Sequence, residues 1–181
     1  MFQRIGRRGW LCRCLLHACF AVFLPAPAEA FEIAGGVSAG AALVGSRPWF
    51  AVSPHASVSR RADSGFLFAV HATLDILPAI DRHGVGVVGH ASTAIGYGWK
   101  SGTFSIGPAL SVYSAPACGV EQCARLRGLA PGGRAQLELY FAGPLGLSAS
   151  TSVDWLTGSD VLPAGLALAA AAGPIVKWGG K

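Results

Sequence analysis

The sequence predicts an all-β protein: a single antiparallel up-and-down β-barrel of about eight strands, preceded by a signal peptide. Three observations predict this fold. Apolar and polar residues alternate with a period of two through most of residues 31–181, as in strands whose two faces meet different environments. The alternating segments are separated by stretches rich in Gly and Pro, which number 25 and 11 in the chain of 181 residues. The first 30 residues have the three parts of a secretory signal.

The leader, residues 1–30, is basic at its start, apolar in its middle and small at its end. Four arginines precede an apolar stretch over residues 15–24, and Ala28-Glu29-Ala30 is the expected cleavage motif before Phe31. The apolar stretch is shorter than the roughly 20 residues that a spanning helix needs, so we expect cleavage rather than an anchor. The mature chain then has 10 basic and 8 acidic residues, and the net charge falls from +5 to +2. So small a charge argues against a nucleic-acid-binding protein.

Eight segments of the mature chain show the alternation. In the clearest, residues 134–141, Arg134, Gln136 and Glu138 share one face, and apolar residues fill the other. Because a helix would repeat every 3.6 residues, we interpret all such segments as strands. In chain order they are residues 33–43, 49–60, 66–75, 85–100, 103–114, 134–141, 145–155 and 164–178.

The connections between these segments alternate in length. From the third segment onward the order is long, short, long, short and medium. Residues 115–133 form the longest connection, which contains Pro116 and Pro131, and we predict a loop there. Membrane barrels have short turns at one end and long loops at the other, so the alternation favours a barrel over a soluble meander.

Cys118 and Cys123 are the two cysteines of the mature chain. An even pair in an exported protein predicts a disulfide, which here would close a small ring within loop 115–133. Two free thiols are the alternative. A metal site is disfavoured, because the pair has no companion ligands at zinc spacing. We expect no metal and no cofactor.

The chemistry of the polar face predicts which face meets lipid. Ser, Thr, Gly and Ala dominate this face, and only 13% of all residues are charged, against about 25% in ordinary domains. Small polar residues suit the packed interior of a narrow barrel. We therefore expect the apolar face to point outward into lipid. On the segment 103–114 this face carries Phe104, Ile106, Leu110 and Val112.

Tryptophans at strand ends support a membrane barrel. Two of them, Trp49 and Trp155, are expected at the end with long loops, and Trp99 and Trp178 at the end with short turns. Membrane barrels carry aromatic girdles at both interfaces, and we expect these four residues to be interfacial aromatics.

Charged and histidine side chains on the inward face predict a polar network in the lumen. Its members are Arg134, Glu138, Asp154, His71 and His90. Charges inside a barrel must be paired. Eight strands leave an interior that side chains just fill, so we expect a plug rather than the lining of a channel.

The leader, the alternating strands, the loop asymmetry and the closing segment 173–178 together resemble small, eight-stranded bacterial outer-membrane β-barrels. The resemblance covers residues 31–178 and lies in the architecture, since no sequence motif is matched. It implies a place in the outer membrane of the cell envelope and a structural or surface-interaction role without catalysis. It also implies contact with outer-membrane lipid and with a surface partner through loop 115–133.

Two other functions stay open. A soluble exported barrel that binds a small apolar ligand would have the same alternation with its faces reversed. A membrane-embedded hydrolase of the lipid A deacylase type could use His90 and Ser92, which share one strand face. Such a histidine needs an orienting acid, and no Asp or Glu lies between Asp81 and Glu121. We therefore expect His90 to be a lumen histidine.

Overall fold

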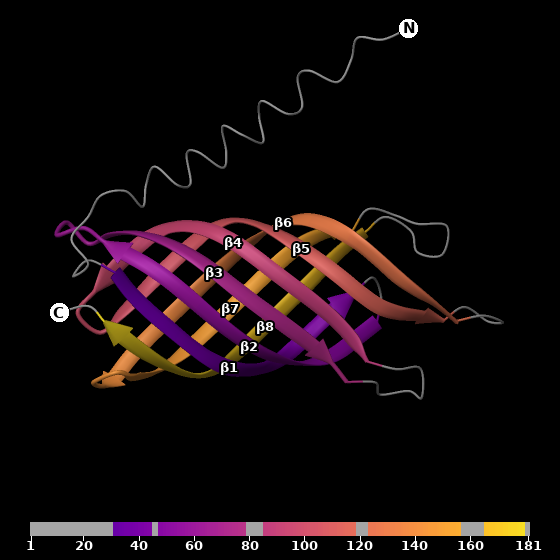
Figure 1. Ribbon diagram of the computed structural model, residues 1–181, viewed down its shortest axis with the longest axis horizontal. Helices are drawn as coiled ribbons and strands as arrows, with labels where there is room; N and C mark the ends of the chain where they lie inside the picture. Colours follow the sequence, from indigo (N-terminus) through magenta and orange to yellow (C-terminus); the bar gives the residue numbers. More distant parts are fainter. Residues whose placement is uncertain (1–30, 45–46, 79–84, 119–122, 157–164, 180–181) are drawn as a thin grey trace, which may run out of the picture. The chain divides into compact units, whose positions relative to one another are not determined.

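The computed structural model describes residues 31–44, 47–78, 85–118, 123–156 and 165–179. In these residues the chain forms eight antiparallel strands that close into one barrel (Figure 1), which confirms the predicted fold class. The strands are β1 (Phe31–Val44), β2 (Arg47–Arg61), β3 (Phe66–Leu77), β4 (Gly86–Trp99), β5 (Gly102–Cys118), β6 (Cys123–Ala142), β7 (Leu145–Leu156) and β8 (Gly165–Gly179). The predicted signal peptide lies outside the described residues and stays a prediction.

Each strand pairs with the next along the chain, and the last strand pairs with the first. The register between β1 and β8 brings Ala34 opposite Lys177 and Val44 opposite Ala167, so the closing seam runs nearly the whole length of β1. Among the described residues, no helix is long and apolar enough to cross a membrane.

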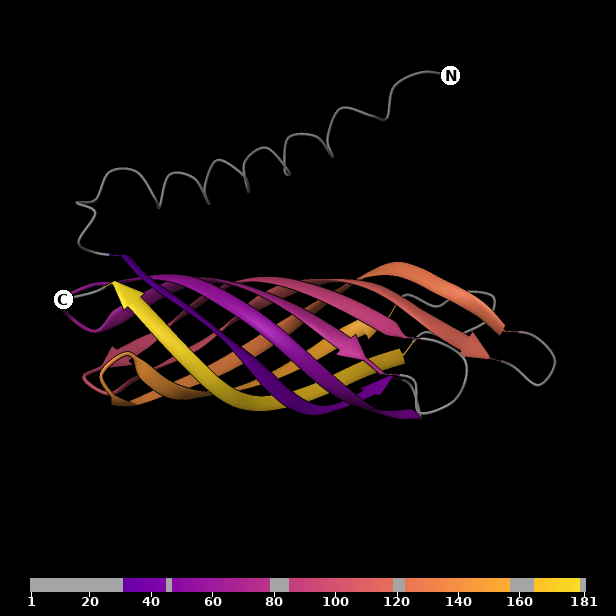
Figure 2. The same ribbon diagram turned by 60° about the horizontal axis from the view of Figure 1, so that its bottom comes forward.

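The two ends of the barrel differ in their connections. Short turns after β2, β4 and β6 lie at one end, where β1 also begins and β8 ends (Figure 2); we call this the short-turn end. Gly65 and Gly143 in two of these turns have positive φ angles of 88° and 60°, which glycine adopts without steric cost. The two longest connections, between β3 and β4 and between β7 and β8, lie at the opposite end, which we call the long-connection end.

The predicted loop over residues 115–133 is wrong for most of its length. β5 continues to Cys118 and β6 starts at Cys123, so this region is a two-stranded ribbon that projects at the long-connection end (Figure 1). We call residues 115–118 and 123–131 the β5–β6 ribbon. The register between β6 and β7 begins at Gly132 opposite Asp154. Pro131 therefore sits just beyond this pairing, at an edge where a residue without an N–H is tolerated.

The outward face of the barrel is apolar around its whole circumference. All eight strands expose large hydrophobic side chains there. On β5 these are Phe104, Ile106, Leu110 and Val112, the residues expected to face lipid. A soluble barrel would bury such side chains.

Candidate functional site in the barrel lumen

The lumen is lined by the polar half of each alternating strand. Its buried polar residues come from seven of the eight strands, and most carry hydroxyl, carboxyl, imidazole or guanidinium groups. Most of the charged ones fall into an aspartate–histidine cluster, an arginine beside a small cavity, a glutamate cluster and an ion-pair cluster at the short-turn end. The buried Ser38 and Ser148 instead hydrogen-bond to His55.

Two aspartates and a histidine from different strands form the first cluster. His90 on β4 has its Nε2 2.9 Å from Oδ2 of Asp75 on β3 and its Nδ1 2.7 Å from Oγ of Ser111 on β5. The Ser111 hydroxyl donates to Oδ1 of Asp154 on β7 at 2.8 Å. A second oxygen of Asp154 lies 3.6 Å from Nδ1 of His90. The result is a chain of hydrogen bonds with a carboxylate at each end.

This cluster supplies the orienting acid that the sequence did not reveal near His90. The acid is Asp75, which precedes the histidine by 15 residues and meets it because β3 and β4 pair with Thr73 opposite His90. The serine that contacts His90 is Ser111, and not the expected Ser92, whose hydroxyl has no hydrogen-bond partner in the described part of the chain. Asp75 could have been found from its sequence, because it shares the inward face of its segment with His71.

The geometry does not suit nucleophilic catalysis. A catalytic serine gives its proton to the histidine and must be reachable by substrate. Here the Ser111 hydroxyl donates to Asp154, and Ser111 is 1% exposed. The arrangement is that of a buried network in which the imidazole and hydroxyl satisfy two carboxylates.

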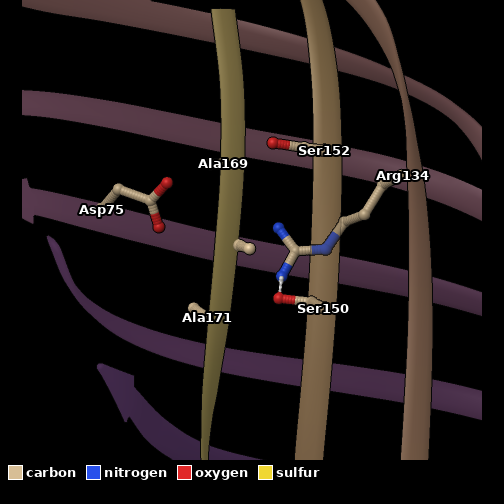
Figure 3. Close-up of a pocket in the computed structure, with 7 residues that line it drawn as sticks. Asp75, Arg134, Ser150, Ser152, Ala169 and Ala171 are labelled. Atoms are coloured by element: carbon tan, nitrogen blue, oxygen red, sulfur yellow. Dashed lines mark hydrogen bonds between the residues drawn. The ribbon is translucent and has the colours of Figure 1, made fainter. Parts of the chain in front are cut away.

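Arg134 on β6 lies beside a small cavity (Figure 3). Its Nη2 donates to Oγ of Ser150 on β7 at 3.1 Å, and its side chain is directed toward Asp75 across the cavity. Arg134 and Glu138 share a strand face, as predicted, but among the described residues they form no ion pair with one another. His71 hydrogen-bonds to Ser105 at 3.1 Å, and no hydrogen bond joins it to His90 in the described structure.

Glu138 is the centre of the next cluster and accepts hydrogen bonds from four side chains. The donors are Tyr140 at 2.6 Å, Gln136 at 2.8 Å, Thr103 at 3.2 Å and Ser57 at 3.4 Å. Both oxygens of this buried carboxylate therefore accept hydrogen bonds from side chains, as buried polar groups require.

A cluster of ion pairs lies at the short-turn end of the lumen. Glu32 at the start of β1 pairs with Arg61 at the end of β2, and Lys177 at the end of β8 lies 3.7 Å from the same carboxylate. The Lys177 ammonium also stands 4.6 Å from the ring centroid of Tyr140. Because Glu32 and Lys177 lie on the first and last strands, their ion pair bridges the closing seam.

An apolar cluster lies near the long-connection end of the lumen. Ala42, Ala51 and Leu77 are buried there, and Trp49 packs against them. Trp49 thus lies on the inward side of β2, which differs from its expected place in an aromatic girdle. Trp49 is two residues from the buried Ala51, and side chains two residues apart lie on the same face of a strand.

The other three expected interfacial tryptophans are placed differently. Trp155 and Trp178 are exposed on the outward face, at 54% and 56%. They lie at opposite ends of the barrel, because each is near the last residue of its strand and β7 and β8 run antiparallel. Trp99 is half-buried at the end of β4, where its carbonyl oxygen accepts a hydrogen bond from Arg61 at 3.0 Å.

The predicted disulfide falls on residues whose side chains lie outside the description. The backbone register pairs Cys118 with Cys123 as the last pair of the β5–β6 ribbon. The disulfide therefore stays a prediction.

Comparisons with known proteins identify the fold. No protein-family model and no curated protein matches the chain. Neisserial surface protein A matches 82% of this chain and 97% of its own, with 16% identity and a TM-score of 0.55. The N-terminal β-barrel domain of OprF from Pseudomonas aeruginosa matches 83% and 98%, with 13% identity and a TM-score of 0.52.

A third similar structure is that of Ail, the attachment invasion locus protein of Yersinia pestis, solved with the heparin analogue sucrose octasulfate. It matches 83% of this chain and 99% of its own, with 9% identity and a TM-score of 0.53. These neighbours are eight-stranded outer-membrane barrels, so the resemblance seen in the sequence is confirmed for the fold. At these identities the likeness defines the class of fold and no particular activity.

Proposed function

We propose that this protein is an integral β-barrel of the bacterial outer membrane with a structural or surface-interaction role and no catalysis. The observation that carries the proposal is the polarity of the barrel, which is apolar outside and charged and polar inside. Ile106 on β5 is 54% exposed, whereas its neighbour Ser105 is 3% exposed. This is the arrangement of a barrel whose solvent is lipid.

The apolar outer surface supports lipid as the first partner. Soluble monomers rarely expose contiguous apolar patches beyond a few hundred Å². In this barrel the exposed large hydrophobics are spread over all eight strands, so no single protein interface would cover them. A bilayer covers the whole circumference at once.

The contents of the lumen support a plug. Charged clusters, an apolar cluster near the long-connection end and ion pairs at the short-turn end occupy the interior of the described barrel. An eight-stranded barrel is just wide enough to be filled by side chains. We therefore propose that the barrel does not conduct ions.

The β5–β6 ribbon is the part of the barrel best suited to a surface partner. It projects past the end of the β4–β5 register, which stops at Val87 opposite Ser114. Pairing within the ribbon continues to the final cysteine pair, so it presents an ordered two-stranded backbone. We propose that a partner at the cell surface binds this ribbon.

The two alternative functions are less well supported. A carrier of an apolar ligand needs an apolar cavity, whereas the cavity beside Arg134 is lined by charged and hydroxyl side chains together with alanines. A hydrolase needs a reachable nucleophile, whereas Ser111 is buried and donates to Asp154.

Membrane fractionation combined with gel mobility tests the proposal. The protein should enter the outer-membrane fraction, require detergent for release, and migrate faster on a gel before heating than after it, because a folded barrel is more compact than the unfolded chain. Release by osmotic shock without detergent would refute it. The hydrolase alternative predicts that His90→Ala abolishes deacylation of lipid A. We expect instead that the purified variant does not differ from the unsubstituted protein in this assay.

A further inference from the structure

A small cavity lies inside the barrel between Arg134 and Asp75. Ser150 and Ser152 of β7 also line it, and the inward alanines Ala169 and Ala171 of β8 form its back wall. Because β8 contributes only small side chains at this level, the neighbouring strands cannot fill the space. Figure 3 shows the Arg134 side chain and the Asp75 carboxylate turned toward each other across it.

The charged group beside this cavity has unused hydrogen-bonding capacity. Arg134 is 7% exposed, and its Nε atom is buried without a hydrogen-bond partner among the residues that the structure describes. Its Nη2 reaches Ser150, but among the described residues its guanidinium makes no ion pair with Asp75. A buried unpaired N–H of a charged group costs free energy comparable to that of a lost hydrogen bond.

The size and lining of the cavity restrict its occupant. There is room for about one water molecule, and a polar cavity of this kind holds water whereas an apolar one stays dry. An anion would approach the guanidinium but would also meet Asp75, and Asp154 lies near enough to interact with Arg134. A neutral molecule that accepts from Arg134 and donates to Asp75 satisfies both groups.

We propose that this cavity is a binding site for a single buried water, which links Arg134 to Asp75. The water accepts a hydrogen bond from the Arg134 guanidinium and donates one to the Asp75 carboxylate. It thereby joins the arginine to the Asp75–His90–Ser111–Asp154 chain, so that side chains from five strands form one continuous network. The site is a property of the folded lumen and does not depend on where the barrel resides.

Two isosteric substitutions on β8 test this assignment. Ala171→Thr and Ala171→Val fill the cavity with the same volume, but only threonine has a hydroxyl that can replace the hydrogen bonds of the water. We expect the folding equilibrium constant of the Thr variant to exceed that of the Val variant by about tenfold, the value of one hydrogen bond. The outward neighbour supplies the control, because at Ala172 valine should equal or exceed threonine in lipid.

A preference for valine at both positions would overturn the proposal, because it would mean that the cavity is dry. If either variant at Ala171 fails to fold, NMR of the unsubstituted barrel decides. A water cross-peak at the Arg134 Nε–H is expected, and its absence would refute the site. Stability should be independent of chloride concentration. A saturable gain with chloride that Arg134→Met abolishes would identify the occupant as an anion and overturn the assignment to water.

Discussion

The outward and inward faces of the strands differ in the substitutions that they tolerate, although a single alternating sequence pattern produces both. On β5 the outward Phe104 and Leu110 are exposed apolar side chains, and we expect each to be replaceable by another apolar side chain of similar size. The inward Ser111 is bound to specific partners on β4 and β7. The outer face is therefore defined by composition, whereas the inner face is defined by pairing.

This difference follows from the surroundings of the two faces. In the proposed bilayer, the outward face has only to keep charged groups away from lipid. The charged side chains of the lumen are largely buried, so each of them needs a partner of its own. A single change should consequently be tolerated outside when it stays apolar and be costly inside when it removes one member of a pair.

Removal of His90 should have the largest effect. His90→Leu leaves the buried carboxylates of Asp75 and Asp154 without the imidazole, and we expect the free energy of unfolding to fall by about 3–5 kcal/mol. Ala91→Leu, on the outward neighbour, should change it by less than about 0.5 kcal/mol. Urea unfolding in lipid vesicles measures both. Equal effects of the two substitutions would contradict the distinction between the faces.

A charge on the outward face should have the next largest effect. Ile106→Arg should lower the free energy of unfolding by about 2–4 kcal/mol if the residue lies near the bilayer midplane. Labelling of single cysteines on a Cys118→Ser, Cys123→Ser background checks the orientation. A lipid-soluble reagent should modify Ile106→Cys and spare Ser105→Cys. The reverse pattern would mean that the barrel is inside out and would favour the soluble alternative.

The two tryptophans at the long-connection end should respond differently to lipid. Trp49 packs on the lumen cluster, so Trp49→Ala should cost about 2 kcal/mol, below the range for a fully buried tryptophan. In variants that retain a single tryptophan, brominated lipid should quench Trp155 strongly and Trp49 weakly. Strong quenching of Trp49 would mean that its side chain meets lipid and belongs to the interfacial girdle.

Loss of the cysteine pair should have the smallest effect on the barrel. Cys118→Ser with Cys123→Ser should change the free energy of unfolding by less than about 1 kcal/mol, because the ring is small and the ribbon lies beyond the barrel pairing. Faster proteolysis of the ribbon or weaker partner binding is expected instead. Mass spectrometry of unreduced peptides tests the bridge itself, and two freely alkylated thiols would disprove it.

The sequence by itself determined the barrel and its polarity. The period-two alternation predicted all eight strands, because every strand of an amphipathic barrel must repeat the same local pattern whatever its neighbours are. The choice of Ser, Thr and Gly for the polar face predicted which side is the interior. His71, His90, Arg134, Glu138 and Asp154 were expected in the lumen, and each is buried in the barrel.

Only the tertiary structure decided which side chains meet. The partners of His90 are Asp75, Ser111 and Asp154, which lie on three other strands and are set by the register of four strand pairings. Strand pairing also decided the extended conformation of the β5–β6 ribbon. Its prolines indicate a loop when read locally, but cross-strand hydrogen bonds between β5 and β6 keep the region extended. Register depends on the alignment of whole strands and on their closure into a ring, and no local pattern in one segment contains that information.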